Sequence, residues 1–151
     1  MTVWCLGSIN ADHFYTVPHL VEPGETLMAQ NHSKGLGGKG ANQSVAAARA
    51  GADVCHIGAV GPDGDWAVEA LAEFGVDVSR ISRVDAPTAH AIIQVDAAGE
   101  NAILVYPGAN MMIPDQRARS FGIQTDLALH IHQREIKLTH LPDFFFERHA
   151  L

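Results

Sequence analysis

Apolar runs of strand length recur along the chain, separated by turn-forming residues. Val3–Ile9 and Val54–Val60 predict two buried strands, and Val76–Ile81 predicts a short extended segment. Leu127–His132 is a third candidate for a buried strand, with two histidines inside it. None of these runs approaches the roughly 18 apolar residues of a membrane-spanning helix.

Two segments between the strands carry a helical pattern. Asn42–Ala50 is rich in alanine and is followed by Gly51, a residue suited to the position after a helix end. Trp66–Phe74 repeats apolar residues at helical spacing and is followed by Gly75, with Asp65 placed to cap its first turn. Two further helices are expected nearer the C-terminus, at Gln116–Gly122 and Pro142–Ala150.

Shorter strand patterns predict a second, smaller β element. Phe14–Val17 and Leu27–His32 flank the turn Glu22-Pro23-Gly24-Glu25. Ala89–Val95 and Ala102–Tyr106 flank a glycine-containing loop and predict a hairpin. The order of strands and helices therefore predicts an α/β fold with a sheet core and a small β element beside it.

Composition and charge restrict the class of protein. The 151 residues correspond to one domain, and the 47% hydrophobic content is ample for a core. A net charge of −7 argues against a nucleic-acid partner and against an anionic membrane surface. The first residues lack the basic region of a secretory signal, so we expect a cytoplasmic protein. Cys5 and Cys55 fall within predicted strands, and we expect both to be reduced core residues.

The stretch with candidate chemistry is Gly35-Leu36-Gly37-Gly38-Lys39-Gly40, which leads directly into a predicted helix. Its four glycines allow sharp turns and let a ligand approach the backbone amides. A nucleotide P-loop is one interpretation, but that motif needs glycine where Ser33 stands and serine or threonine where Gly40 stands. The P-loop interpretation is therefore disfavoured.

A dinucleotide-binding fingerprint is a second interpretation. Gly35, Gly37 and Gly40 have its spacing, and Asp63 follows about 20 residues later. In that motif, however, the glycines directly follow a buried strand, and Gln30–Lys34 lacks the apolar residues of such a strand. This interpretation is also disfavoured.

A binding site for a sugar is the third interpretation. Asn10 and Asp12 follow the first predicted strand, and Lys39 and Asn42 stand beside the glycine turn and its amides. If the two segments meet, they surround one cavity with the donors and acceptors that a polyol needs, since each unpaired buried hydroxyl costs roughly 1–3 kcal/mol. The alternative is that Asn10 and Asp12 only stabilise a turn and that Lys39 is solvated.

Several motifs keep a consistent order and spacing between residues 3 and 110. They are Gly7-Ser8-Ile9-Asn10-Ala11-Asp12, Pro23-Gly24-Glu25-Thr26, Gly37 to Ala48, Ala50-Gly51-Ala52, Gly61-x-Asp63, Gly99-Glu100-Asn101 and Gly108-Ala109-Asn110. In these motifs the chain resembles the ribokinase (PfkB-type) family of carbohydrate kinases. The resemblance implies a three-layer α/β/α sheet core, incomplete here, with a small β lid whose strands lie within about 13–34 and 86–106.

The resemblance also implies an activity and a site. It implies ATP-dependent phosphorylation of ribose, or a close pentose, at the 5-hydroxyl, with Mg²⁺ and a monovalent cation assisting the full-length enzymes. It implies a homodimer formed through the β lid. The residues expected to contact the sugar are Asn10, Asp12, Gly38, Lys39, Asn42 and, from the motif Gln133-Arg134-Glu135, Glu135.

One part of the family pattern has no counterpart in this sequence. The second glycine-rich segment of the family carries the catalytic aspartate and the phosphate-binding amides, and Asp115, Asp126 and Asp143 all lack such a setting. We therefore assign no catalytic residue and expect the nucleotide-binding half to be absent. We expect neither ATP nor a metal ion to bind to this chain alone. We further expect that this chain alone has little kinase turnover and that it associates with other chains through an uncovered sheet edge.

Two alternatives remain open at this point. One is a non-catalytic sugar-binding or regulatory module, and the other is a truncated gene product. His130 and His132 form an H-x-H pair, but two ligands are too few for a closed structural metal site. Turn and helix-cap roles are expected for Asp63 and Asp65, rather than metal binding.

Overall fold

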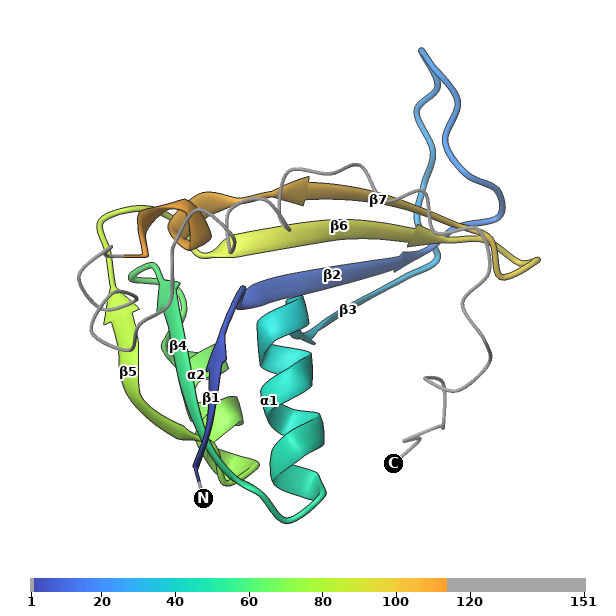
Figure 1. The fold of residues 1–151 in the computed structure, drawn as a ribbon. Helices are drawn as coiled ribbons and strands as arrows, with labels where there is room; N and C mark the ends of the chain where they lie inside the picture. Colours follow the sequence, from blue (N-terminus) through green and yellow to red (C-terminus); the bar gives the residue numbers. More distant parts are fainter. Residues whose placement is uncertain (1, 114–151) are drawn as a thin grey trace.

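The seven strands of residues 2–113, the part of the chain that the computed structural model describes, form two sheets. The first, here called the core sheet, is parallel and contains β1 (Thr2–Leu6), β4 (Asp53–Val60) and β5 (Asp77–Arg83), in the order β1-β4-β5. The second, named the lid sheet after the β lid that the resemblance implies, has the order β3-β2-β6-β7. Its strands are β2 (Asn10–Thr16), β3 (Asn31–Gly37), β6 (Ala89–Val95) and β7 (Asn101–Tyr106). The lid sheet extends across the end of the core sheet and beyond it (Figure 1).

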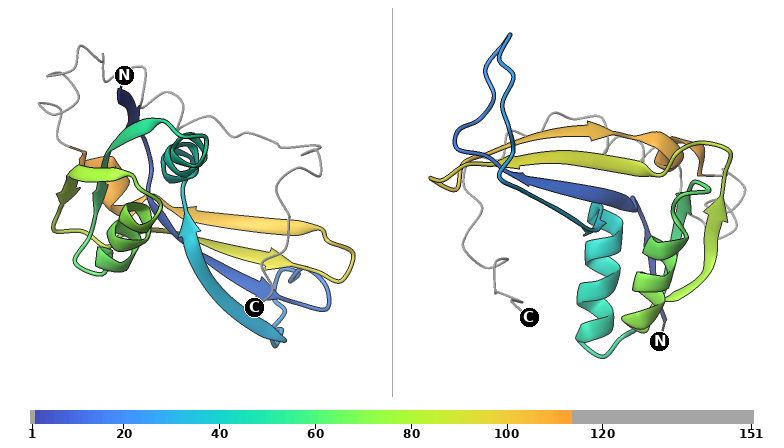
Figure 2. Two further views of the ribbon diagram at one scale, coloured as in Figure 1. Left: turned by 90° about the horizontal axis from the view of Figure 1, so that it is seen from below. Right: turned by 180° about the vertical axis from the view of Figure 1, so that it is seen from behind.

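Two helices connect the parallel strands. α1 (Lys39–Arg49) leads into β4 and α2 (Asp65–Glu73) leads into β5, as parallel pairing requires a crossover connection. Both helices lie on the same side of the core sheet (Figure 2). The described residues thus supply a sheet layer and one helical layer of the expected fold. The short 3₁₀ helix η1 (Gly108–Met112) follows β7.

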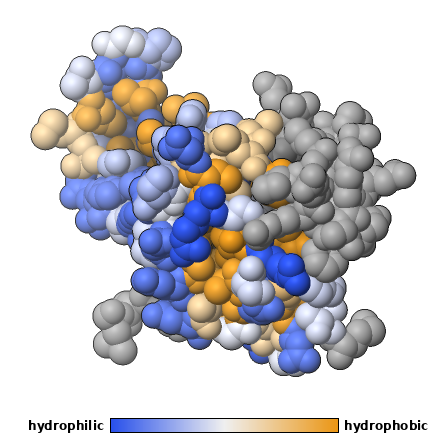
Figure 3. All heavy atoms as spheres, turned by 90° about the vertical axis from the view of Figure 1, so that its left-hand side faces the viewer, coloured by the Kyte–Doolittle hydropathy of each residue, from blue (hydrophilic) through white to orange (hydrophobic). Residues whose placement is uncertain are grey.

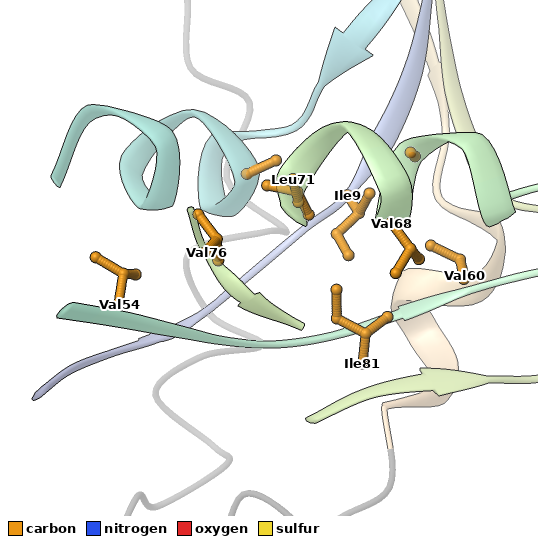
Figure 4. Close-up of a cluster of buried hydrophobic side chains, with 9 residues drawn as sticks. Ile9, Val54, Val60, Val68, Leu71, Val76 and Ile81 are labelled. Atoms are coloured by element: carbon orange, nitrogen blue, oxygen red, sulfur yellow. The ribbon is translucent and has the colours of Figure 1, made fainter. Parts of the chain in front are cut away.

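The hydrophobic core lies between the helices and the core sheet. It includes Ile9, Val60, Leu71 and Ile81, each at most 6% exposed (Figure 4). β4 is the middle strand and its residues 54–60 are all buried, which explains the continuous apolar run in the sequence. No helix in this part of the chain is long and apolar enough to cross a membrane.

Most of the predicted elements in the described region are confirmed, including α1, α2, β4, and the hairpin of β6 and β7. Gly51 and Gly75 end the two helices with φ of +88° and +81°. The amides of each glycine and of the residue after it donate hydrogen bonds to carbonyl groups in the last turn of the helix, as expected for glycine-terminated helices. The predicted segments at 116–122, 127–132 and 142–150 lie outside the described residues.

Three predicted strands differ from those observed, and one of them is β2, which begins at Asn10 although its pattern was expected to start at Phe14. The single buried strand expected at Val3–Ile9 ends at Leu6, because the chain leaves the core sheet at Gly7 and begins β2 at Asn10. Burial was also wrong for the start of this strand, since Thr2, Val3 and Trp4 are exposed. The strand expected at Leu27–His32 is wrong, since the paired strand is β3, shifted toward the glycines. β3 is an exposed edge strand, so no apolar alternation marked its position.

Three predictions about single residues need correction. Asp65 does not cap α2; Gly64 occupies the cap position, and an Asp65 oxygen accepts a hydrogen bond from Arg83 Nε at 2.7 Å. Phe74, the last residue of the apolar pattern predicted for this helix, is 39% exposed, with the Arg49 guanidinium over its ring. Cys5 is only partly buried, although its thiol, like that of fully buried Cys55, is free.

Candidate functional site

The end of β1 and the start of α1 pack directly against each other. A Cβ atom added at Gly7 would lie 2.7 Å from Gly40 Cα, so the two backbones meet at glycine. The Ala41 amide donates a hydrogen bond to the Ser8 carbonyl at 3.0 Å. The two segments that the sequence analysis assigned to one site therefore do lie together.

Gly38 makes this junction possible. It precedes the first residue of α1 with φ of +94°, a conformation that residues with a side chain rarely adopt. A Cβ atom at Gly38 would lie 2.5 Å from the Ser8 carbonyl oxygen and 3.0 Å from the Asn10 nitrogen. Glycine is therefore required here by conformation and by space, which explains why the glycine run leads into the helix.

Asn10 is fixed by a residue that the site assignment had not included. Asn10 Oδ1 accepts a hydrogen bond at 2.9 Å from Asn110 Nδ2 in η1, while Asn110 Oδ1 accepts one from the Ile9 amide at 3.1 Å. Asn110 thus holds both the backbone and the side chain at the start of β2. The motif Gly108-Ala109-Asn110 was a signal for this residue, but it gave no role to the asparagine.

Asp12 lies on β2, opposite Gly35 of β3. A side chain at Gly37 would overlap the Asp12 carboxylate, so glycine leaves the space that this carboxylate fills. Asp12 Oδ1 is buried and accepts no hydrogen bond within residues 2–113. Burial raises the pKa of Asp12 above its ordinary value. An unpaired buried acceptor is unfavourable, and a hydroxyl donor from a ligand would satisfy it.

Lys39 and Asn42 occupy the first turn of α1, directly after Gly38. Both are exposed, and within the described part of the chain neither side chain forms a hydrogen bond or ion pair. They are therefore available to a ligand at the positive end of the helix dipole. Glu135, the remaining sugar-contacting residue suggested by the resemblance, lies outside the described residues, as do His130 and His132.

The structure does not match a dinucleotide-binding motif. The strand before α1 is β3, an antiparallel edge strand of the lid sheet, whereas the fingerprint requires a strand of the parallel core. Gly35 and Gly37 lie within that strand instead of forming a turn after it. The sequence-based reason for disfavouring this interpretation was therefore sound, although a strand does precede the helix.

Asp63 has a structural role in the turn between β4 and α2. One of its oxygens accepts hydrogen bonds from both the amide and the hydroxyl of Thr88, each at 2.8 Å. The pKa of Asp63 is lowered, and the hydrogen bond from the Thr88 amide is the largest cause. Within the described residues no group of three or more His, Cys, Asp or Glu side chains could hold a metal ion.

Comparison with known proteins identifies the family of the chain. The model of the pfkB family carbohydrate kinases matches residues 2–129. Ribokinase of Haemophilus influenzae is 46% identical over 126 residues, which are 82% of this chain and 41% of that protein. The chain thus spans less than half the length of this curated relative.

Solved structures of ribokinases share the fold. The ribokinase of Cryptococcus neoformans in complex with ADP superposes with a TM-score of 0.68 and 46% identity, covering 70% of this chain and 34% of that one. Arabidopsis thaliana ribokinase complexed with ribose and ATP gives 0.64 and 34%, covering 71% of this chain and 36% of that one. The expected ribokinase-like α/β fold is confirmed. With the family model matching most of its length, the chain belongs to the pfkB family of carbohydrate kinases.

Proposed function

We propose that this chain contains the sugar-binding part of a ribokinase-like enzyme that phosphorylates ribose, or a close pentose, at the 5-hydroxyl with ATP. The observation that carries the proposal is the buried Asp12 oxygen without a hydrogen-bond partner in residues 2–113, beside the glycine junction at Gly38. The Arabidopsis relative, solved with ribose and ATP, supports the ligand class.

Each proposed contact follows from the chemistry of the group. The Asp12 carboxylate accepts hydrogen bonds from two neighbouring hydroxyls, which a sugar presents and a single alcohol does not. Asn10 orients the sugar, Lys39 and Asn42 donate from the first turn of α1, and the Gly38 amide lies at a helix start where backbone donors lack helical partners. Glu135 is included as a further contact on the resemblance alone.

These residues would position the acceptor sugar, but they do not fit ATP or its metal. No group of three or more metal-binding side chains occurs in residues 2–113, and the glycine turn does not have the P-loop pattern. Phosphoryl transfer needs donors and a metal around the moving phosphoryl group, and a base for the attacking hydroxyl. We therefore derive no step of that transfer from the described residues.

Titration calorimetry with ribose tests the sugar site. Asp12→Ala should weaken ribose binding more than any other single change at the site, because it removes a carboxylate that can accept hydrogen bonds from two hydroxyls at once. Asp53→Ala is a matched control, since Asp53 is exposed at the far end of β4. Equal ribose affinity in the wild type and in Asp12→Ala would contradict the assignment.

A coupled assay of ADP release tests the second element of the proposal, that the 151-residue chain has negligible kinase turnover by itself. Ribose- and ATP-dependent ADP release at rates ordinary for kinases, about 1–100 per second, would refute this element. If ribose stabilised the chain against unfolding and ATP had no effect, the chain would instead be a sugar-binding module.

The proposal includes a homodimer formed through the lid sheet and a cytoplasmic setting. β7 is an edge strand, so one side of its backbone has no strand partner among residues 2–113. Its apolar side chains Ile103, Leu104 and Val105 are 55%, 68% and 54% exposed. Exposed apolar residues on a sheet edge are typical of a surface that pairs with another chain.

A further inference from the structure

A buried polar pair joins α1 to the middle of the core sheet. Ser44 in α1 and His56 in β4 are both 0% exposed, and Ser44 Oγ lies 2.8 Å from His56 Nδ1. Ser44 is one helical turn after Gly40, so it shares the face of α1 that packs on the sheet. The hydrogen bond therefore fixes the first turns of α1 against β4.

The other side of the His56 ring faces the end of β1. A Cβ atom added at Gly58 would lie 2.8 Å from His56 Nε2 and 3.1 Å from the Gly7 carbonyl oxygen, so these two atoms flank the same glycine. His56 Nε2 is buried and has no hydrogen-bond partner in the described part of the chain. Burial lowers the pKa of His56 to about 4, and the Gly7 backbone opposes this shift. The ring thus stands between α1 and the β1 end.

These two neighbours of His56 belong to the two halves of the candidate site. Gly7 precedes the segment that carries Asn10 and Asp12, and Ser44 follows the turn that carries Lys39 and Asn42. Two sets of backbone hydrogen bonds join the segments: the β2–β3 ladder, which ends with Asn10 opposite Gly37, and the bond from the Ala41 amide to the Ser8 carbonyl. A shift of the ring would therefore change the spacing of the two halves.

We propose that His56, held by Ser44, is a positioning residue that sets the separation between the Asp12 strand and the start of α1. This inference rests on the sugar site proposed above and adds to it a residue that does not touch the sugar. At this lowered pKa the ring is neutral, and we assign the tautomer in which Ser44 donates to Nδ1 and Nε2, on the side of the Gly7 carbonyl, carries the proton.

Packing alone does not explain the pair. A buried imidazole with one nitrogen that lacks a hydrogen-bond partner is less stable than an apolar side chain of similar volume. Phenylalanine at 56 with alanine at 44 would fill the same region of the core without buried polar atoms. The polar pair is therefore explained better by geometry at the site than by stability.

A double-mutant cycle on the full 151-residue chain tests the proposal, using Ser44→Ala, His56→Phe and the double variant. Melting temperature measures packing, ribose calorimetry measures the site, and hydrogen exchange of the Ala41 amide measures the junction directly. Each single variant should lower the melting temperature, because it leaves one polar group unpaired. The double variant should regain much of the melting temperature, yet bind ribose roughly tenfold more weakly and exchange Ala41 faster.

Recovery of both the melting temperature and the ribose affinity in the double variant would show a packing role only and overturn the proposal. A proton on Nδ1, detected by the two-bond nitrogen–proton spectrum of His56, would also overturn it. If the wild type binds no ribose, the proposed function fails, and the positioning role of His56 is then judged on hydrogen exchange of the Ala41 amide alone. Faster exchange in the double variant supports this role, and unchanged exchange refutes it.

Discussion

Asp12 is the residue on which the candidate site depends. Its carboxylate fills the space left by Gly37, and its buried oxygen has no hydrogen-bond donor within residues 2–113. Burial without a partner favours the protonated acid, which is why its pKa is raised. A sugar hydroxyl would reverse this by donating to the ionised form.

The raised pKa predicts opposite effects of acid on stability and on binding. Because the folded-state pKa of Asp12 lies above the unfolded value, its ionisation destabilises the fold, and this destabilisation disappears as pH falls through the folded pKa. If Asp12 binds ribose as a carboxylate, as proposed, ribose should bind more weakly over the same pH interval. Calorimetry and urea unfolding between about pH 7 and pH 4 measure both trends.

Asp12→Asn is the control for this pH dependence, since it keeps the shape and removes the charge. The contribution of Asp12 is the difference in pH dependence between the wild type and this variant. If the ribose affinity of both proteins changes in parallel with pH, Asp12 does not bind the sugar as an anion.

At the scale of residues, the sequence revealed what a backbone motif demands, but not contacts across the fold. Gly38 could be recognised because its conformation is a local property of the helix start. The contact of Asn110 with Asn10 joins residues 100 positions apart, and no local pattern encodes it. The Ser44–His56 pair was missed for a related reason: a serine and a histidine in apolar segments give no periodic signal.

At the scale of elements, the junction between the lid sheet and the core depends on Thr88, just before β6. Thr88 is 1% exposed, donates its hydroxyl to Asp63, and accepts the Gly61 amide at 3.0 Å. The neighbouring Pro87 carbonyl accepts the Ala109 amide at 2.9 Å. The β4–α2 turn, β6 and η1 are therefore held together at one place.

Thr88→Val should lower the free energy of unfolding by about 1–3 kcal/mol, because it leaves the buried Gly61 amide without an acceptor. Thr88→Ser keeps the hydroxyl and should cost less. Urea unfolding of both variants measures the difference. A Thr88→Val variant that is more stable than Thr88→Ser would mean that the methyl group, and not the hydroxyl, holds this junction.

The elements themselves were predicted to different degrees for physical reasons. β4 is buried along almost all of its length and each helix is buried on one face, so the apolar patterns of these elements are strong. β3 was misplaced because an exposed edge strand that includes Gly35 and Gly37 shows neither alternation nor strand propensity. Its position is fixed by pairing with β2, a tertiary effect.

At the scale of the whole molecule, apolar surface is the main feature that no contact in the described region explains. Hydrophobic residues gather at the centre of the face seen from the β5 side (Figure 3). On the lid sheet, β7 adds the exposed apolar side chains of residues 103–106. Surfaces of this kind are typical of association between chains.

Association through the lid sheet predicts a distinct effect for each face of β7. Ile103 and Leu104 are neighbours on the strand and point to opposite faces. Sedimentation velocity should show oligomers in the wild type. Of Ile103→Lys and Leu104→Lys, the substitution on the face that forms the interface should reduce these oligomers more than the other. Asn101→Lys, at the polar start of β7, is the control. A monomeric wild type, or no response to either lysine, would contradict this expectation.

The central claim is that the β2 segment and the start of α1 form one sugar site. An amide chemical-shift titration of the 151-residue chain with ribose tests it most directly and also detects weak binding. The account predicts saturable shifts at Asn10, Asp12, Gly38 and Asn42 that are lost in Asp12→Ala. An absence of shifts at these amides, or saturable shifts confined to other parts of the chain, would contradict it.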